Sequence, residues 1–510
     1  MKKKLWGLIL SLCIILTLIG CTSEGNKEDG STTPPTNQTE QGEQEKKDDG
    51  KNEPPYTITV GYPVYTAAQP DLQKVFDRVN EVTLEKINAK IELKVVPISQ
   101  MASVYSVAVS SGEKLDVIMM VPGSQFLISY AASNMIRPID AEVEQYGQDI
   151  KAALGHILDA ARYQGKLYGV PSKEITVNGR GVVMLKSIID KYNIDISKIK
   201  TYHDLDEVFE IVKKNEPDMY VFWPSSVSYY FLNYEGFGNY YGVVKNGGVD
   251  DLKLINMYED SDWIEAVKKM REWYEKGYIP KDIATTQEHP SALQNSGKVF
   301  AIHNVYSPDL DILAENPSKT AVCFVEPVET TSLYQTFIWA VPSHCEKPEK
   351  SIQFLNLAFQ DVELATSMKY GIKGEHYDVV SDGVIDNAKG FQNYMQYWSI
   401  WGDTAKLPLL KTKLMGAAEG SIEKYRSIME DWAQKTKRSK AFGFTFDPTP
   451  VKTEIAALDA ISEKYRALEY GALDPDEVLE KMKGELQNAG LQKVIDEKQR
   501  QLDEWLKNKQ

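Results

Sequence analysis

A regular alternation of strand-like and helix-like segments constrains the fold of this chain more than any other feature. Strand patterns cover residues 58–60 and 91–98, and a nearly continuous apolar run forms a third at residues 116–121. Such a run is typical of a strand that is buried on both faces of a parallel sheet. Helix patterns lie between the strands, and the first has one apolar face, formed by Leu72, Val75, Phe76 and Val79. This order predicts a right-handed parallel sheet with helices on its faces.

The ends of these strands predict where a ligand would bind. We expect the first strand to break at Gly61 and Pro63, because glycine and proline interrupt strand patterns. In open α/β sheets, ligands bind beyond the carboxyl ends of the strands. Residues 61–66 and 122–126 are therefore expected at the rim of a site.

The same alternation restarts later in the chain. Residues 205–212 show a helical apolar face, residues 219–222 form a candidate strand, and residues 262–276 form a candidate helix. We therefore expect residues 170–178 to cross from a first lobe into a second. From about residue 417 the chain is mostly helical, and we expect the apolar stripe of its last helix to pack on the second lobe.

The N-terminal segment has the layout of an export signal. Three lysines precede an apolar run at residues 5–20, which is short for a membrane-spanning helix and is followed by polar residues. Residues 18–21, with the sequence LIGC, resemble a bacterial lipobox, in which lipid would be attached to Cys21. An ordinary signal cut nearby and an uncleaved anchor are the alternatives.

The segment after Cys21 is expected to be a disordered tether. Residues 22–55 contain no aliphatic or aromatic side chain, so they cannot bury enough apolar surface to fold. A flexible coil of this length spans about 30–35 Å. Such a tether would hold a folded domain away from a membrane and let it turn.

These patterns together predict the domain organisation. The predicted parts are a signal peptide at 1–20, a lipid-anchored linker at 21–55, a first lobe at 56–170 to which part of 300–345 returns, a second lobe at 171–300, and a mostly helical C-terminal region at 346–510 that completes the second lobe.

Charge and cysteine content narrow the function classes. A net charge of −15 at pH 7 opposes binding to nucleic-acid phosphates. Four cysteines occur, of which Cys13 lies in the signal and Cys21 in the lipobox-like sequence. Export would permit a disulfide between Cys323 and Cys345. We instead expect two unrelated thiols, because Cys323 lies in an apolar strand-like run where a small core residue fits.

No sequence motif for catalysis is present. The chain lacks a phosphate-binding loop, an HExxH pair, a CxxC pair and a GxSxG elbow, and none of its six histidines pair at metal-ligand spacing. We therefore expect neither an enzyme nor a cofactor nor a bound metal. Carboxylates are abundant, so a surface glycoside hydrolase or lyase remains an alternative without specific support.

Clustered aromatic residues are the positive signal for binding. The chain has 28 tyrosines against 15 phenylalanines, and rings are dense at residues 220–234, 239–241 and 394–401. Tyrosine suits half-exposed surfaces, because its ring is apolar and its hydroxyl is polar. Sugar rings stack on such side chains through their C–H faces. The alternative is that most of these rings belong to the core.

Several short motifs resemble one family of proteins. They are GKLYGVP at 165–171, SGKVFA at 296–301, PEKSIQFLN at 348–356 and KYGIKGEHY at 369–377. Their order and spacing are similar to those of extracellular solute-binding lipoproteins of carbohydrate-type ABC importers. Residues 442–454 and 486–502 resemble the C-terminal domain of unknown function found in a Gram-positive subgroup of that family.

The resemblance implies a fold and a function. It implies an α/β fold of the type II periplasmic-binding-protein kind, with two hinged lobes, a ligand between them, a helical C-terminal region and no catalysis. The expected protein is a monomer that is lipid-anchored on the outer face of the cytoplasmic membrane. It is expected to bind a small-molecule ligand and no nucleic acid. It would capture an oligosaccharide and deliver it to ABC permease subunits. A peptide or another solute on the same fold is the alternative ligand.

The candidate binding residues combine rings for stacking with polar groups for hydroxyl recognition. The predicted ligand-binding set is Tyr62, Tyr65, Gln125, Trp223, Tyr229, Tyr230, Glu375, Tyr377, Trp398 and Trp401. Residues 170–178 and 304–307 are the predicted hinge strands that would let the lobes close on a ligand.

Cys21→Ser tests the predicted anchor. Without the thiol no lipid can be attached, so the protein should appear in the medium or remain as an uncleaved precursor. Cell fractionation with a lipid label and a mass measurement would show this. A Cys21→Ser protein that stays in the membrane fraction at the normal mature mass would contradict lipid attachment at this residue.

Overall fold

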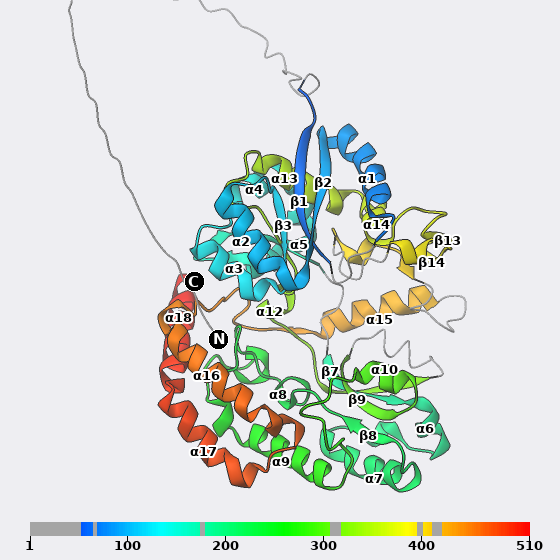
Figure 1. The fold of residues 1–510 in the computed structure, drawn as a ribbon, viewed down its shortest axis with the longest axis vertical. Coiled ribbons are helices and arrows are strands. Elements are labelled where there is room, and N and C mark those ends of the chain that lie inside the picture. The colour runs from blue at the N-terminus through cyan, green and yellow to red at the C-terminus, as the bar shows by residue number, and fades with distance from the viewer. Residues whose placement is uncertain are drawn as a thin grey trace, which may run out of the picture. The chain divides into compact units, whose positions relative to one another are not determined.

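A computed structural model describes residues 53–64, 69–173, 179–306, 318–394, 401–410 and 421–509 (Figure 1). These residues belong to one compact unit that begins at Glu53. Cys21 and most of the predicted tether lie outside the described residues, as do residues 174–178 of the first predicted hinge and residue 307 of the second.

The first sheet has five strands and contains the early alternating segment. Its order is β2-β1-β3-β12-β6, with bounds of Ala89–Pro97, Tyr56–Val64, Val117–Met120, Ile338–Ala340 and Val170–Pro171. β1 pairs in parallel with both β2 and β3, through Val60↔Leu93 and Val60↔Val117. The predicted parallel arrangement of these three strands is confirmed. β12 comes from far later in the chain and runs antiparallel to β3 and β6.

The predicted break in the first strand is wrong. β1 continues through Gly61 and Pro63 to Val64. Gly61 is needed for a close approach, because a Cβ atom there would lie 2.7 Å from the ring of Tyr105. The Tyr105 hydroxyl donates a hydrogen bond to the Gly61 carbonyl at 2.9 Å. The strand therefore uses the glycine to admit a buried ring and does not end at it.

Helices cover the first sheet as expected for an α/β lobe. They are α1 (Leu72–Ile87), α2 (Met101–Ser111), α3 (Gly123–Ala132), α4 (Asp140–Tyr146), α5 (Gln148–Leu154), α13 (Pro348–Gln360) and α14 (Val362–Tyr370). Val75, Phe76 and Val79 are buried on α1, which confirms its predicted apolar face. Side chains of α13 and α14 join the core cluster of this sheet. The assignment of the whole region 346–510 to the second lobe is therefore corrected for these two helices, whose apolar faces find their partners on the first sheet.

The second sheet has four strands in the order β10-β7-β9-β8. Their bounds are Lys319–Val325, Gly179–Leu185, Val299–Tyr306 and Tyr220–Trp223. β8 and β9 are parallel, whereas β7 is antiparallel to both of its neighbours. The neighbouring helices are α6 (Lys186–Lys191), α7 (Leu205–Asn215), α8 (Val227–Tyr230), α9 (Ser261–Glu275) and α10 (Pro290–Asn295). α7 buries Leu205, Val208, Phe209 and Val212, which is the predicted face.

The C-terminal helices pack on this second core. They are α16 (Lys452–Tyr465), α17 (Pro475–Asn488) and α18 (Leu491–Lys509). Figure 1 shows α17 beside α9, with α18 farther out. Leu491, Val494, Ile495 and Leu502 of α18 belong to the same hydrophobic cluster as the second sheet. The predicted packing of the last apolar stripe on the second lobe is confirmed.

The remaining strands and helices lie outside the two main sheets and the C-terminal helices. They are β4 (Arg162–Tyr163), β5 (Lys166–Leu167), β11 (Val328–Glu329), α12 (Thr331–Tyr334), β13 (Tyr377–Ser381), β14 (Val384–Asn387), β15 (Leu409–Leu410), α15 (Ser421–Lys435) and β16 (Lys437–Arg438). Within the part of the chain that the structure describes, no helix is both long and apolar enough to cross a membrane.

The two later cysteines do not form a disulfide with each other. Cys323 lies on β10 of the second sheet, where its thiol contacts the Val325 carbonyl at 3.2 Å. Cys345 is buried in the first core, 3.4 Å from a carboxylate oxygen of Asp116. The expectation of two unrelated thiols is confirmed, because Cys323 lies half-buried on the second sheet and Cys345 lies in the first core. The buried core thiol is Cys345, whereas Cys323 is only partly covered.

Replacing Trp401 by alanine should destabilise the first lobe. Trp401 is buried and stacks on Trp339 with ring centres 4.1 Å apart, so truncation would leave a large cavity. We expect a loss of about 3–5 kcal/mol in the free energy of unfolding, measured by urea denaturation. Val107→Ala, on the exposed face of α2, is the control and should change it by less than about 0.5 kcal/mol. Equal effects of the two substitutions would contradict the core position of Trp401.

Candidate functional site

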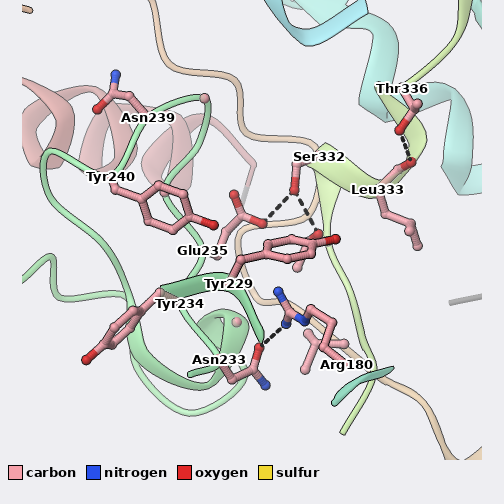
Figure 2. Close-up of a pocket in the computed structure, with 15 residues that line it drawn as sticks. Arg180, Tyr229, Asn233, Tyr234, Glu235, Asn239, Tyr240, Ser332, Leu333 and Thr336 are labelled. Atoms are coloured by element: carbon pink, nitrogen blue, oxygen red, sulfur yellow. Dashed lines mark hydrogen bonds between the residues drawn. The ribbon is translucent and has the colours of Figure 1, made fainter. Parts of the chain in front are cut away.

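A pocket of about 320 Å³ lies where the second lobe meets the chain segment that leads back to the first sheet (Figure 2). One wall consists of Arg180 at the start of β7, Tyr229 on α8 and the loop that follows α8. The other wall consists of residues between Val328 and Thr336, just before β12. The pocket therefore joins elements of both lobes. Its polar and aromatic lining residues are Arg180, Tyr229, Asn233, Tyr234, Glu235, Asn239, Tyr240, Thr330, Ser332 and Thr336.

Arg180 supplies the positive charge of the pocket. Its Nη2 atom donates a hydrogen bond to Asn233 Oδ1 at 2.9 Å. Its guanidinium also lies 4.7 Å from the centre of the Tyr229 ring, a cation–π arrangement that fixes both side chains. The Nε–H group of Arg180 is buried without a hydrogen-bond partner in the described structure. Arg180 therefore has a donor available for a bound polar group.

Glu235 supplies a buried carboxylate that connects the two walls. It accepts a hydrogen bond from Ser332 Oγ at 2.7 Å across the pocket and one from the backbone N–H of Phe237 at 2.8 Å. Ser332 Oγ is also 3.0 Å from Thr330 Oγ1. Figure 2 shows Glu235 between Ser332 and the loop that carries Tyr240. Both the carboxylate and the hydroxyls are suited to sharing hydrogen bonds with ligand hydroxyl groups.

Three tyrosines line the pocket, and Tyr229 and Tyr240 offer the accessible rings because Tyr234 is buried. Tyr229 is 38% exposed, and Tyr240 is half-buried with its hydroxyl end directed toward Glu235 (Figure 2). Burial raises the pKa of Tyr240, so its hydroxyl stays protonated and can donate as well as accept. Rings beside convergent polar groups are the usual lining of a small-molecule site.

A charged cluster stands behind the wall that leads to the first sheet. Glu329 accepts hydrogen bonds from His156 Nε2 at 2.7 Å, Arg438 Nε at 2.6 Å and the Tyr334 hydroxyl at 3.0 Å. These partners come from the first lobe, the C-terminal region and α12. Burial opposes ionisation of Glu329, but the hydrogen bonds from His156 and Arg438 outweigh it and hold the pKa of Glu329 below its usual value. The cluster therefore fastens Val328–Thr330 to the first lobe and to the C-terminal region.

Among the predicted second-lobe residues, only Tyr229 lines this pocket. Tyr230 is half-buried and stacks on His303, with ring centres 4.9 Å apart. Trp223 is 6% exposed at the end of β8 and belongs to the second core. The structure thus gives Trp223 a packing environment, and its role in binding stays a prediction.

The predicted aromatic residues near the first sheet are core residues. Tyr62 and Trp401 are each 1% exposed and stack at 6.2 Å, because the apolar faces of β1 and the chain before β15 meet there. Tyr377 is buried as well. None of the three lines the pocket. A ligand could reach them only if this core opened.

The remaining predicted residues divide into two groups. Glu375 is exposed and forms an ion pair with Lys74 on α1, and Gln125 lies in α3. Tyr65 and Trp398 fall outside the described residues. The binding roles of these four residues therefore stay predictions.

The structure adds pocket residues that the sequence did not single out. Arg180, Asn233, Glu235 and Ser332 line the pocket. Asn233 and Glu235 are close in sequence to the aromatic cluster, whose polar members could have been included. Arg180 and Ser332 lie in no motif, and only the folding of β7 and α12 around the same space brings them together.

No group of three or more His, Cys, Asp or Glu side chains that could hold a metal ion occurs among the described residues.

Comparisons with known proteins place this geometry in context. Residues 82–374 match the family described as bacterial extracellular solute-binding protein, and residues 440–507 match a domain of unknown function (DUF3502). A carbohydrate ABC transporter substrate-binding protein of Streptococcus pneumoniae is 26% identical over 86% of this chain and 90% of that protein. Lipoprotein LipO of Bacillus subtilis is 24% identical over 59% of this chain and 64% of its own length.

Solved structures show the same fold. The N-glycan transport solute binding protein of S. pneumoniae has a TM-score of 0.78 at 24% identity. The match covers 89% of this chain and 100% of that chain. The alginate-binding protein AlgQ2 has a TM-score of 0.61 at 15% identity, covering 89% of this chain and 99% of that chain. These likenesses confirm the predicted two-lobe α/β fold of type II with a helical C-terminal region.

Glu329→Gln should change how stability depends on pH. The pKa of Glu329 is depressed in the folded protein, so its stabilising contribution is present above its unfolded pKa and is lost as pH falls through the folded value. At pH 7 the substitution should cost about 1.5–3 kcal/mol of unfolding free energy, the usual worth of hydrogen bonds to a charged group. Urea denaturation between pH 7 and pH 3 should show this cost shrinking toward the acid end.

Glu480→Gln is the matched control, because Glu480 is 89% exposed in its ion pair with Lys483. It should cost less than about 0.5 kcal/mol at pH 7. A cost for Glu329→Gln that stays constant across the pH range would show that its ionisation contributes nothing.

Proposed function

Because the chain belongs to the bacterial extracellular solute-binding protein family, we propose that it captures an oligosaccharide between its lobes and delivers it to the permease of an ABC importer. The observation that carries the proposal is the pocket between the second lobe and the segment that leads to β12. Its position between the lobes is where closure would enclose a ligand.

The chemistry of the pocket favours a saccharide over an apolar solute. Tyr229 and Tyr240 offer ring faces for stacking, and Arg180, Asn233 and Glu235 offer donors and acceptors around them. A sugar needs both, because its ring presents C–H groups on its faces and hydroxyls at its edge. The volume of about 320 Å³ lies at the lower end of small-molecule pockets, which suits one part of a longer ligand.

The names of relatives support the same ligand class. The S. pneumoniae relative is named as a carbohydrate transporter component, and the N-glycan transport solute binding protein has been solved with Man1GlcNAc and with Man5GlcNAc. These saccharides are the first probes to test on this chain. A peptide or another solute remains the alternative ligand for the same fold.

The proposal includes a lipid anchor at Cys21 and a place on the outer face of the cytoplasmic membrane. The lipobox-like sequence supports the anchor, as does the name of lipoprotein LipO among the relatives. The proposal also takes the protein to be a monomer. Residues 170–178 and 304–307 would act as hinges, and ligand would draw the lobes at 56–170 and 171–300 together. No reaction is proposed for the pocket.

Tyr229→Ala and Arg180→Met should weaken binding of Man5GlcNAc measured by titration calorimetry. Loss of the stacking ring should cost about 0.5–1.5 kcal/mol, which is about two- to tenfold in Kd. Both side chains lie at the pocket surface, so the melting temperature should change little. Trp223→Ala is the contrasting variant, because it should lower the melting temperature strongly through loss of core packing.

Other results would overturn parts of the proposal. If the wild-type protein binds peptides from a pool and binds no saccharide, the ligand is a peptide and the proposed oligosaccharide is wrong. Turnover of a glycan would replace the binder with a glycoside hydrolase or lyase. Unchanged affinity in Tyr229→Ala and Arg180→Met would move the site away from this pocket.

A further inference from the structure

The most unusual charged group outside the pocket lining is the buried ammonium of Lys498. Lys498 lies on α18, within the part of the chain that matches the domain of unknown function, and has no exposed surface. Its Nζ donates to the carbonyls of Gly236 at 2.8 Å, Asn239 at 3.0 Å and Gly242 at 2.9 Å. A fourth contact, at 3.0 Å, is to Asn239 Oδ1.

All four oxygen contacts belong to the loop that forms one wall of the pocket. This binding loop, residues 235–244, is closed at its base by paired hydrogen bonds between Glu235 and Val244, at 3.1 and 3.0 Å. Glu235, Gly236, Gly238, Asn239 and Tyr240 of the loop line the pocket. One lysine from the C-terminal domain therefore fills the centre of a loop that presents ligand-facing side chains on its other side.

The backbone of the binding loop needs such a partner. Phe237, Gly238 and Gly242 have positive φ angles of 52°, 106° and 88°. This irregular path turns the Gly236, Asn239 and Gly242 carbonyls toward one point. Carbonyls that converge on one point repel one another, and an ammonium with several donors can satisfy all three at once. The Gly236 carbonyl also accepts a longer hydrogen bond from the Asn239 N–H, at 3.3 Å.

Burying a charged lysine opposes its ionisation. Burial lowers the pKa of Lys498 to about 7, and the nearby Glu235 carboxylate acts in the opposite direction. The oxygen contacts offset part of this cost, and the ring of Phe446 lies 5.2 Å from Nζ. Packing alone would be served better by an apolar side chain at this position. The buried ammonium is therefore explained by its hydrogen bonds to the loop carbonyls.

The rest of α18 is fixed independently of Lys498. Gln499 Oε1 accepts a hydrogen bond from the Leu254 N–H at 2.8 Å, and Gln501 Oε1 accepts one from the Asp447 N–H at 2.8 Å. Leu491, Val494 and Leu502 are buried against the second core. The helix is thus a rigid support from which Lys498 reaches the binding loop.

We propose that the C-terminal domain holds the binding loop in its ligand-ready conformation, with Lys498 as the positioning residue. The proposal rests on the proposed function, because it assumes that the pocket lined by this loop is the ligand site. Lys498 does not itself line the pocket. It acts through Glu235, Asn239 and Tyr240, whose placement depends on the path of the loop.

Hydrogen–deuterium exchange on the ligand-free full chain tests the positioning role without any ligand. In Lys498→Met, which keeps a long side chain but removes the ammonium, amides of residues 235–244 should exchange at least tenfold faster. Exchange in β7, β8 and β9 should stay as in the wild type. Lys493→Met is the matched control on the same helix, because Lys493 bonds the carboxylate of Glu454 and does not contact the loop. It should leave loop exchange unchanged.

Two results would overturn the positioning role. Loop exchange that is unchanged in folded Lys498→Met would show that the ammonium does not hold the loop. Faster exchange spread evenly over the second lobe and the C-terminal helices would assign Lys498 to general stability. If Lys498→Met does not fold, Lys498→Gln, which retains two N–H donors, takes its place. Failure of both to fold would equally assign Lys498 to general stability.

Chemical rescue and affinity separate this proposal from the proposed function. Propylammonium, which has the atoms removed in Lys498→Ala, should restore loop protection in that variant, whereas tetramethylammonium, which has no N–H donor, should not. Rescue by both cations or by neither would contradict the hydrogen-bonding role. Binding of Man5GlcNAc to Lys498→Met should weaken about tenfold with little change in melting temperature. Altered loop exchange with no Man5GlcNAc binding by the wild type would sustain the role of Lys498 and reject that ligand.

Discussion

The return of the chain to the first sheet at β12 is the constraint on which the pocket depends. Ile338–Ala340 pair with β3 on one side and β6 on the other, so the chain before them is held between the lobes. That preceding segment contributes Thr330, Ser332 and Thr336 to the pocket. Without this late strand, the second lobe would carry an aromatic loop with no opposing wall.

Two polar contacts fix the segment in place. Ser332 donates to Glu235 across the pocket, and Glu329 gathers His156, Tyr334 and Arg438 behind it. The first contact joins the wall to the binding loop, while the second joins it to the first lobe and the C-terminal region. Because carboxylates that are buried or partly buried need several donors, each glutamate brings together elements that are remote in sequence. The same physical rule accounts for Lys498, where one buried cation gathers the carbonyls of an irregular loop.

Aromatic residues separate into two roles according to their neighbours. Trp401 lies against Trp339 in the first core, and Trp223 lies in the second core. Tyr229 and Tyr240 instead sit among Arg180, Asn233 and Glu235 at the pocket. A ring can stack on a ligand only if one face is left uncovered, and the cores cover tryptophan faces because they offer the largest apolar area. At the pocket, Tyr229 stays 38% exposed beside the Arg180 guanidinium, and Tyr240 directs its hydroxyl end toward Glu235.

The sequence by itself determined the α/β character, the parallel pairing of the first three strands and the apolar faces of α1, α7 and α18, because these follow from side-chain periodicity within one segment. It also pointed to the neighbourhood of Tyr229. Only the tertiary structure decided that Tyr62 and Trp401 belong to the core and that Arg180 and Ser332 face the same pocket. Likewise, nothing in the local pattern shows that Lys498, on an amphipathic helix, turns inward to carbonyls more than 250 positions earlier in the chain. These features depend on which elements pack together, and periodicity describes each element without its partner.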